Sequence, residues 1–304
     1  MLWKKFFSFI FVLITVSLLV FYWFIPSTSF EFYQGYTSNN FNFSLNNSNL
    51  EMQFYENMRY SDSEISYRIS NCPLQKKSDM ERAFEIISNK TSLGFYEVVD
   101  NEEIFTTCSS RNKIENNLFI AGEGGPVNIT RTDNFNVILH GEILLIRDSK
   151  CEKPNIGLHE LLHALGFDHS LNPGSIMYNV SKCSQDIGQD ITDKINKLYS
   201  FPSYSDLTFE NVSAEMHGKY LDTNITIRNH GLKDSEKTKL MIYADEKLVK
   251  EIELNSLKIG YGTTITLNNV LVPKINIQEL KFFIDSNFPE LEKNNNEIKL
   301  KIKN

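Results

Sequence analysis

The chain has 304 residues, of which 41% are hydrophobic and 23% are charged, and both fractions are ordinary for folded protein. This length allows about two domains together with additional segments. The formal net charge is -7, and the sequence has no cluster of Lys or Arg. Composition therefore argues against a nucleic-acid partner.

An apolar segment follows the first few residues. Residues 6–25 form an unbroken run of apolar and small hydroxyl side chains, preceded by Lys4 and Lys5. Such a run is long enough to cross the ~30 Å hydrocarbon core of a membrane as a helix. The two lysines should stay in the cytoplasm, which places everything after Pro26 outside the cell. We therefore predict a single-pass signal anchor in the cell membrane, with the lipid bilayer as its partner.

The alternative for residues 6–25 is a cleaved signal peptide, which would make the protein secreted. The apolar core of a signal peptide is typically ~7–15 residues long and ends in an Ala-x-Ala-like site. Here the run is longer, and only residues 27–29 offer small side chains. The pattern favours the uncleaved anchor.

Residues 26–56 are rich in Asn, Ser, Phe and Tyr and have little periodicity, so we expect a stalk or a short pro-segment. A folded domain is predicted for residues 57–201. Residues 64–69 alternate like a strand, and residues 93–99 read as another. Between them, Ser78 and Glu81 form a capping box that predicts the start of a helix.

The segment 159–169 carries the pattern expected of a catalytic metal site. His159 and His163, four residues apart on a helix, project from one face and can reach a single ion. Glu160 can hold a water molecule beside that ion. Gly166 permits a positive φ, so the helix can end in a reversal that brings His169 back as a third ligand. Three protein ligands leave a fourth position open, which is typical of a catalytic zinc.

The surroundings of this helix are predicted from simpler signals. Asn155 can cap it. Its buried face is supplied by Leu158, Leu161, Leu162 and Leu165. Residues 137–139 and 142–146 read as two strands that precede it, and residues 121–126 as a tight loop. His140 is isolated from the motif, and a lone histidine on a strand is more often solvated or satisfied in the core, so we assign it no metal role.

A turn-rich run, residues 172–178, follows the zinc helix and ends in Met177-Tyr178. The helix and this run together resemble the metzincin superfamily of zinc endopeptidases, whose signature is a zinc helix followed by a Met-turn. Ser170 after the third histidine, and Tyr178 after the methionine, are most similar to the matrixin branch. The resemblance implies that Met177 forms an apolar floor beneath the metal. It also implies that Tyr178 helps to wall the pocket for the residue after the scissile bond.

The resemblance has further implications for this domain. It implies an α+β fold, with a mixed sheet plus three helices, that ends on a helix at residues 190–199. It also implies that a sheet edge pairs with the substrate backbone, and we expect residues 142–146 beside that cleft. Asn179 stands where astacin-like members have a metal-reaching Tyr, so we expect no fifth protein ligand. The Pro-Arg-Cys-Gly segment that confers latency on matrixins is missing, so latency must work differently.

The chain has four cysteines: Cys72, Cys108, Cys151 and Cys183. None lies in a Cys-x-x-Cys pair, so we predict no second, thiolate zinc site. An even number in an exported chain predicts two disulfides, for which three pairings exist. We prefer Cys151 with Cys183, which would clamp the zinc helix and Met-turn. Cys72 with Cys108 would then tie the early part of the domain.

A second domain is predicted for residues 205–304, after the boundary at residues 201–203. Short alternating segments there have the spacing of an antiparallel sandwich: residues 224–228, 239–243, 248–254, 263–267, 280–284 and 297–301. Residues 229–231 and 285–297 resemble the CARDB adhesion-type module, which implies an all-β immunoglobulin-like sandwich. This part has no catalytic constellation. We expect it to act as a spacer or to dock a cell-surface protein or glycan.

Together these patterns predict a membrane-anchored extracytoplasmic zinc endopeptidase. One Zn²⁺ ion would be held by His159, His163 and His169, and Glu160 would assist a zinc-activated water that hydrolyses a protein or peptide substrate. The alternative is a catalytically inactive surface adhesion or scaffold protein that retains a metalloprotease fold. A third reading is a zinc hydrolase acting on non-peptide amides.

Overall fold

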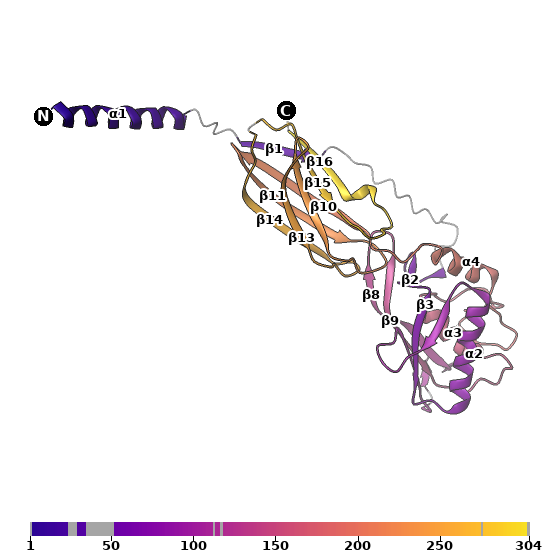
Figure 1. Ribbon diagram of the computed structural model, residues 1–304. Coiled ribbons are helices and arrows are strands. Elements are labelled where there is room, and N and C mark those ends of the chain that lie inside the picture. The colour runs from indigo at the N-terminus through magenta and orange to yellow at the C-terminus, as the bar shows by residue number, and fades with distance from the viewer. Residues whose placement is uncertain are drawn as a thin grey trace.

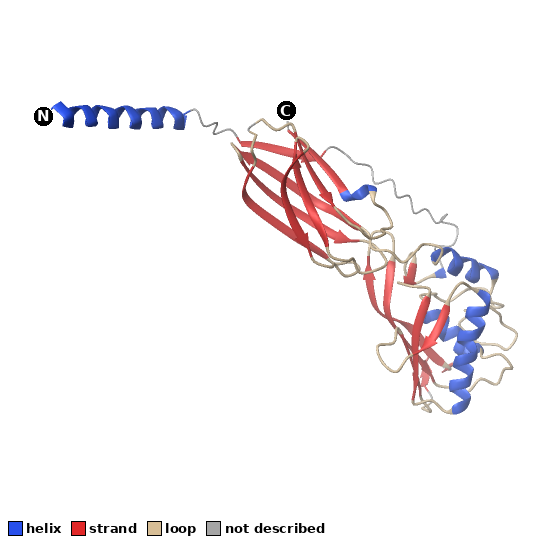
Figure 2. Ribbon diagram, in the orientation of Figure 1, coloured by secondary structure: helices blue, strands red, loops and turns tan. Residues whose placement is uncertain are grey.

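The computed structural model describes residues 2–23, 29–34, 52–111, 113–115, 118–274 and 276–302. The chain forms a mixed α/β domain and a β-rich C-terminal domain, which lie end to end (Figures 1 and 2). An apolar helix, α1 (Leu2–Trp23), precedes them.

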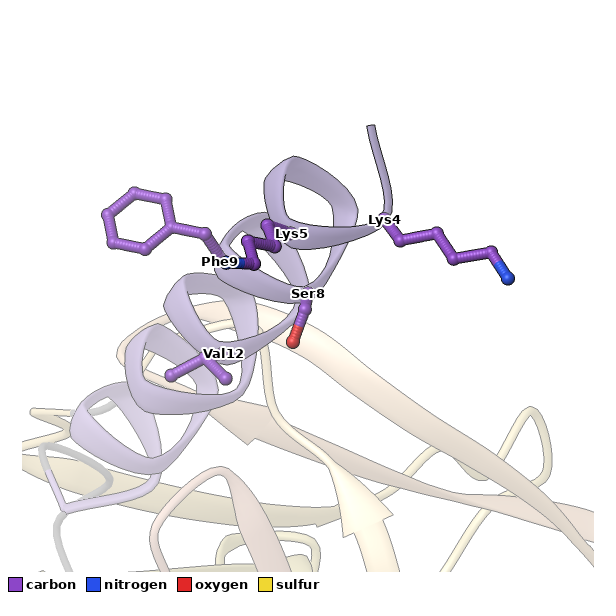
Figure 3. Close-up of a pocket in the computed structure, with 5 residues that line it drawn as sticks. All are labelled: Lys4, Lys5, Ser8, Phe9 and Val12. Atoms are coloured by element: carbon purple, nitrogen blue, oxygen red, sulfur yellow. The ribbon is translucent and has the colours of Figure 1, made fainter. Parts of the chain in front are cut away.

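Helix α1 is long and apolar enough to cross a membrane, with a mean hydropathy of 1.8 over the window Trp3–Val20. A signal sequence passes the same test of length and composition. A hollow runs along one side of its first turns, where Lys4 extends away from the helix and Phe9 leaves on another side (Figure 3). This hollow is the surface of a lone helix, so we assign it no function.

The mixed domain is built on one sheet. Its parallel strands follow the order β2-β9-β5-β3-β4, and β8 pairs antiparallel with β9 on the other side. The strands are β2 (Met58–Tyr60), β3 (Glu64–Ser70), β4 (Gly94–Glu97), β5 (Ile104–Cys108), β8 (Gly122–Arg131) and β9 (Asn136–Leu145). A separate hairpin joins β6 (Lys113–Glu115) to β7 (Leu118–Ile120).

Three helices complete this domain: α2 (Leu74–Lys90), α3 (Asn155–Ala164) and α4 (Gln189–Leu198). The four leucines predicted to form the buried face of the zinc helix are all 3% exposed or less. Burial of each such side chain contributes about 1.5–3 kcal/mol. On α4, the side chains of Ile191, Ile195 and Leu198 are buried as their helical spacing predicts. Helix α3 is therefore packed against the core along its whole apolar face.

Both helix starts differ from the prediction. Helix α2 begins at Leu74, after Pro73, so Ser78 and Glu81 lie inside the helix and form no capping box. The φ of -58° at Pro73 already suits a helix entry. Asn155 is the first residue of α3 and not its cap, because the cap position is held by Pro154. The side-chain amide of Asn155 instead donates to the carbonyl of Lys182 at 2.7 Å. Asn155 thus ties the zinc helix to the loop after the Met-turn.

The tight loop predicted at residues 121–126 is wrong, because β8 starts at Gly122. The two strands predicted at 137–139 and 142–146 are one continuous strand, β9. Among the described residues β8 has a ladder partner on one side only, so it forms the edge of the sheet. An edge position tolerates Pro126, whose missing N–H is not needed by a second neighbour.

Eight strands form the sheet of the C-terminal domain, in the order β13-β12-β15-β16-β1-β10-β11-β14 and antiparallel throughout. They are β1 (Ser29–Gln34), β10 (Leu207–His217), β11 (Tyr220–Asn229), β12 (Thr238–Ala244), β13 (Lys247–Leu254), β14 (Gly262–Leu271), β15 (Glu279–Ile284) and β16 (Glu297–Ile302). A short 3₁₀ helix, η2 (Asn294–Asn296), precedes β16. The six predicted segments match β11 to β16, whereas β10 was not predicted.

Strand β1 comes from the segment expected to be a stalk or pro-segment. Instead of standing apart, residues 29–34 lie in the C-terminal sheet between β10 and β16. Residues 52–56 of the same segment lie against the mixed domain, where Gln53 forms a bridge with Phe167. Residues 26–28 and 35–51 of that prediction lie outside the described residues.

The two domains meet in a packed junction. Phe135 and Val137, at the turn between β8 and β9, share an apolar cluster with Leu232 and Ile259 of the C-terminal domain. The backbone N–H of Asp133 donates to the imidazole of His230 at 3.2 Å. The two domains are therefore joined by packed side chains and a hydrogen bond as well as by the linker between them.

Arg59 supports the same junction from within the mixed domain. Its side chain is 1% exposed and donates to the carbonyls of Leu198 at 2.5 Å and Phe201 at 3.2 Å. The guanidinium carbon lies 4.3 Å from the centre of the Tyr199 ring. Arg59 therefore fixes the end of α4 at the point where the chain leaves for the C-terminal domain.

The preferred disulfide pairing is confirmed. Cys72 is bonded to Cys108 and Cys151 to Cys183, across sequence separations of 36 and 32 residues. Closing loops of this length stabilises a fold by about 3–4 kcal/mol each in the chain-entropy description.

Candidate metal centre

Helix α3 and the reversal after it bring three histidines together. His159 and His163 lie on the last turns of α3. Gly166 follows with a φ of +94°, and its N–H donates to the carbonyl of His163 at 2.9 Å. A side chain there would be strained, and a Cβ would lie 2.6 Å from Met58. The turn returns His169 to the helix, and one ring nitrogen of each histidine lies within 4.8 Å of the others.

Backbone carbonyls orient two of the three rings. The Nδ1 atom of His159 lies 2.7 Å from the carbonyl oxygen of Ile176, and that of His163 lies 2.8 Å from the carbonyl oxygen of Phe167. A carbonyl oxygen only accepts hydrogen bonds, so each Nδ1 carries the proton and each Nε2 presents a lone pair. The Nε2 atom of His163 is 3.0 Å from that of His159 and 3.2 Å from that of His169.

These donors fit a zinc ion. Lone pairs that converge at such distances repel one another unless they share a cation. Tetrahedral zinc with Zn–N bonds of ~2.0–2.1 Å needs its nitrogen ligands about 3.3 Å apart, close to the spacing found here. Burial, with a contribution from His159, lowers the pKa of His163 to about 4, and burial also lowers the pKa of His159. Both imidazoles are therefore neutral, as metal ligands must be.

Glu160 is buried beside these ligands, with 5% of its surface exposed. Burial, with a smaller effect from the charge of Glu123, raises the pKa of the Glu160 carboxyl to about 8. Strand β8 passes very close to it. A Cβ on Gly122 would lie 2.8 Å from Oε1 of Glu160, and one on Gly124 would lie 2.3 Å from its backbone oxygen. The glycines that made this segment look like a loop are what allows the strand to approach α3.

The Met-turn lies against the histidines. Met177 is 1% exposed, and its carbonyl accepts a hydrogen bond from the N–H of Ser170 at 2.8 Å. The neighbouring residue Ile176 supplies the carbonyl that orients His159. Tyr178 is half-buried and forms a bridge with Ser170. The role of Tyr178 as a pocket wall stays a prediction.

A segment ahead of the mixed domain also reaches the site, and no pattern in the sequence predicted this contact. The ring of Phe54 stacks on that of His163, with 5.7 Å between centroids, and its N–H donates to the carbonyl of Gly166 at 3.0 Å. Met52 accepts a hydrogen bond from the N–H of Asp168. A cavity of about 300 Å³ opens here, beside His169 and the first turn of α4. Residues 52–54 thus cover the reversal that positions the third histidine.

His140 lies apart from the cluster, on β9, with its Nδ1 atom 3.0 Å from the carbonyl oxygen of Glu102. Within the described residues the three histidines are the one group of metal-ligating side chains of this kind. Residues 142–145 do not form the sheet edge themselves, because β9 pairs with β5 on one side and β8 on the other. That residues 142–146 lie beside a substrate cleft stays a prediction. The edge next to Glu160 is β8.

Comparisons with known proteins agree with the predicted resemblances. Residues 59–200 match the family described as Matrixin, and residues 205–300 match the family described as CARDB. The interstitial collagenase of Oryctolagus cuniculus is 27% identical over 158 residues, covering 47% of this chain and 33% of the collagenase. That of Sus scrofa is 27% identical over 157 residues, with the same coverage. The chain therefore spans about a third of the length of the curated relatives it matches. The resemblance to matrixins and CARDB modules is confirmed over these two ranges.

One similar solved structure is a CARDB domain from Pyrococcus furiosus, described as a complex with di-metal ions. It is 19% identical and covers 32% of this chain and 88% of that one, with a TM-score of 0.27. A score this low carries no argument about the present fold.

Replacing the third histidine tests the metal centre without any activity assay. We expect the purified wild-type chain to hold about one zinc ion, and His169→Ala to lose it on dialysis, because only two ligands remain. His140→Ala is the matched control and should keep its zinc. Metal content is measured by atomic emission. Equal zinc in His169→Ala and wild type would show that the metal, if bound, lies elsewhere.

Proposed function

We propose that this protein is a zinc-dependent endopeptidase displayed outside the cell on a membrane anchor. The observation that carries the proposal is the convergence of three imidazole Nε2 atoms next to a buried carboxylic acid. The matrixin match over residues 59–200 supports peptide hydrolysis as the reaction. His159, His163 and His169 are the proposed zinc ligands and Glu160 the proposed acid–base residue.

Each residue has a defined task in this proposal. Zinc, when bound, supplies Lewis-acid activation of water and of the scissile carbonyl. Glu160 accepts a hydrogen bond from the attacking water, takes its proton and delivers it to the departing amine. A carboxyl with a pKa near 8 holds a proton well, and a nearby divalent cation lowers this pKa, so that Glu160 both accepts and returns the proton near neutral pH.

The substrate would bind along β8. Within the described residues no strand pairs with β8 on the side away from β9, so an extended peptide can add to it as a further strand. Gly122 and Gly124 let β8 pass directly beside Glu160. By resemblance, Met177 forms the floor beneath the ion and Tyr178 lines the pocket for the residue after the scissile bond. Domain limits of 57–201 and 205–304 complete the proposal, with a metzincin-like fold in the first and an immunoglobulin-like sandwich in the second.

The competing function is a surface adhesion or scaffold protein in which the same fold is inactive. The CARDB match over residues 205–300 is what favours it, because this part carries no catalytic group and could dock a cell-surface protein or glycan. Both functions keep the fold, so activity separates them.

Substitution of the proposed acid–base residue is the decisive experiment. We expect wild type to cleave members of a broad peptide library in a chelator-sensitive way. Glu160→Ala should reduce kcat/KM by about 10²–10⁴-fold, because general acid–base catalysis is lost, while zinc content is unchanged. Glu85→Ala, on the exposed face of α2, is the control and should behave as wild type. A zinc-loaded wild type that cleaves nothing would favour the adhesion protein.

The glycines of β8 offer a second test of the same geometry. In Gly122→Ala the new methyl overlaps the Glu160 carboxyl, so we expect kcat to fall by about tenfold to a hundredfold, as a misplacement near 1 Å does. Gly125→Ala, on the same strand, meets open space and should retain wild-type kcat. Single-turnover rates on a fluorogenic peptide separate the two variants. Equal rates would remove the role of β8 in positioning Glu160.

Membrane anchoring is tested by fractionation. An uncleaved anchor predicts that full-length protein stays in membranes washed with alkaline carbonate. Leu13→Arg/Val16→Arg should weaken insertion, because each charge near the middle of the span costs about 2.5–3.5 kcal/mol. A soluble product that begins after residue 26 would instead establish a cleaved signal peptide.

A further inference from the structure

Strand β1 belongs to the C-terminal domain although it precedes the mixed domain in sequence. Residues 29–32 pair with residues 214–217 of β10, and residues 32–34 pair with residues 300–302 of β16. Phe32 is 7% exposed and joins the apolar core of that domain. Figure 1 shows β1 lying across the end of the domain at which β16 ends.

This strand is the link between two parts of the sheet. Four strands, β13, β12, β15 and β16, lie on one side of it, and three strands, β10, β11 and β14, lie on the other. In the described part of the chain β10 and β16 each pair with β1 and not with each other. The domain therefore contains a slot with a strand edge on either side, which fits one extended segment with an apolar side chain at the position of Phe32.

The segment that fills the slot is the one that follows α1. Residues 24–28 separate Trp23 from Ser29, and five residues bridge at most about 20 Å. Ser29 pairs with His217, at the end of the domain that also holds the pair Tyr220 and Leu271. The mixed domain contacts the opposite end, at His230 and Leu232. The helix is thus attached to the end of the C-terminal domain that lies away from the metal centre.

We propose that the slot between β10 and β16 is the docking site for the strand that carries the membrane anchor. The hydrogen bonds and packing of β1 then hold the folded domains to the anchor even when the backbone between them is cut. A cut between Gln34 and Met52 leaves α1 and β1 on one fragment and both folded domains on the other, and the two fragments stay together. Only the membrane readout of this inference rests on the anchor in the proposed function.

A cut chain tests the docking directly. The full-length Glu160→Ala chain receives a recognition site for a sequence-specific protease between residues 34 and 52, is purified in detergent and is cut to completion. We expect the two fragments to co-elute on gel filtration and to separate only in denaturant. In membranes the large fragment should stay in the pellet. Separate elution of the fragments in detergent overturns the proposal, whatever the outcome for activity or membrane location.

Two phenylalanines of β1 provide matched variants. Phe32→Ser removes the side chain buried in the slot, whereas Phe30→Ser changes a side chain that is 38% exposed on the same strand. After the cut, Phe32→Ser should release the large fragment about tenfold faster or more, and Phe30→Ser should resemble the unsubstituted chain. Equal release from the two variants would show that the slot does not hold β1.

A competition experiment covers the case in which Phe32→Ser disturbs folding before the cut. Excess synthetic peptide with the sequence of residues 29–34 is added to the cut, unsubstituted protein. We expect it to take the slot and speed release of the anchor fragment, and the same peptide with Phe32→Ser to have little effect. No difference between the two peptides would overturn the assignment of Phe32 to the slot.

Discussion

The orientation of two imidazoles by backbone carbonyls is the interaction on which the proposed metal centre depends. His159 donates to Ile176 and His163 to Phe167, and these carbonyls belong to the Met-turn and to the reversal after α3. A helix alone places two histidines on one face, but it does not decide which ring nitrogen carries the proton. The turn at Gly166 and the bond between Ser170 and Met177 fix that choice, since they hold the two acceptors in place. The irregular backbone is therefore as much a part of the site as the ligands are.

Burial shifts the pKa values of the acid and the bases of this site in opposite directions, and both shifts favour the neutral form. It lowers the pKa of His163 to about 4 and raises that of Glu160 to about 8, so both groups prefer their neutral forms near pH 7. Neutral imidazoles suit a cation, whereas a neutral carboxylic acid does not serve as a base. A divalent cation held by the three histidines would favour the carboxylate and offset the desolvation. The same apolar packing would thus prepare the ligands and make the basicity of Glu160 depend on the ion.

Local signals in the sequence predicted most of this site. The spacing of the three histidines, the leucine periodicity of the zinc helix and the even number of cysteines each reflect contacts within a short stretch of chain or a simple pairing rule. The failures have a different origin. Gly122 and Gly124 are needed because β8 approaches α3 closely. Helix α3 lies more than thirty residues away in the sequence, so the local pattern of glycines predicts a loop instead.

Strand β1 was missed for the same reason on a longer scale, since its partners lie in β10 and β16, far along the chain. Asn155 was assigned as a cap from its residue type, but a distant carbonyl, that of Lys182, takes its amide. Sequence patterns therefore predicted the parts of the site that are formed by residues close together in the sequence. They did not predict the parts formed by contacts between distant segments.

The chain contributes strands to the C-terminal domain both before and after it forms the mixed domain. The chain passes through this domain as β1, forms the mixed domain, and re-enters it as β10, which lies next to β1. The β8–β9 hairpin adds a third connection, since its turn contacts His230 and Leu232 while the other end of β8 lies against Glu160. A domain held at its exit and at one hairpin loses more orientational freedom than one on a single linker. Strand β8 therefore borders the proposed catalytic acid at one end, and at its other end it leads into the turn that packs on the C-terminal domain.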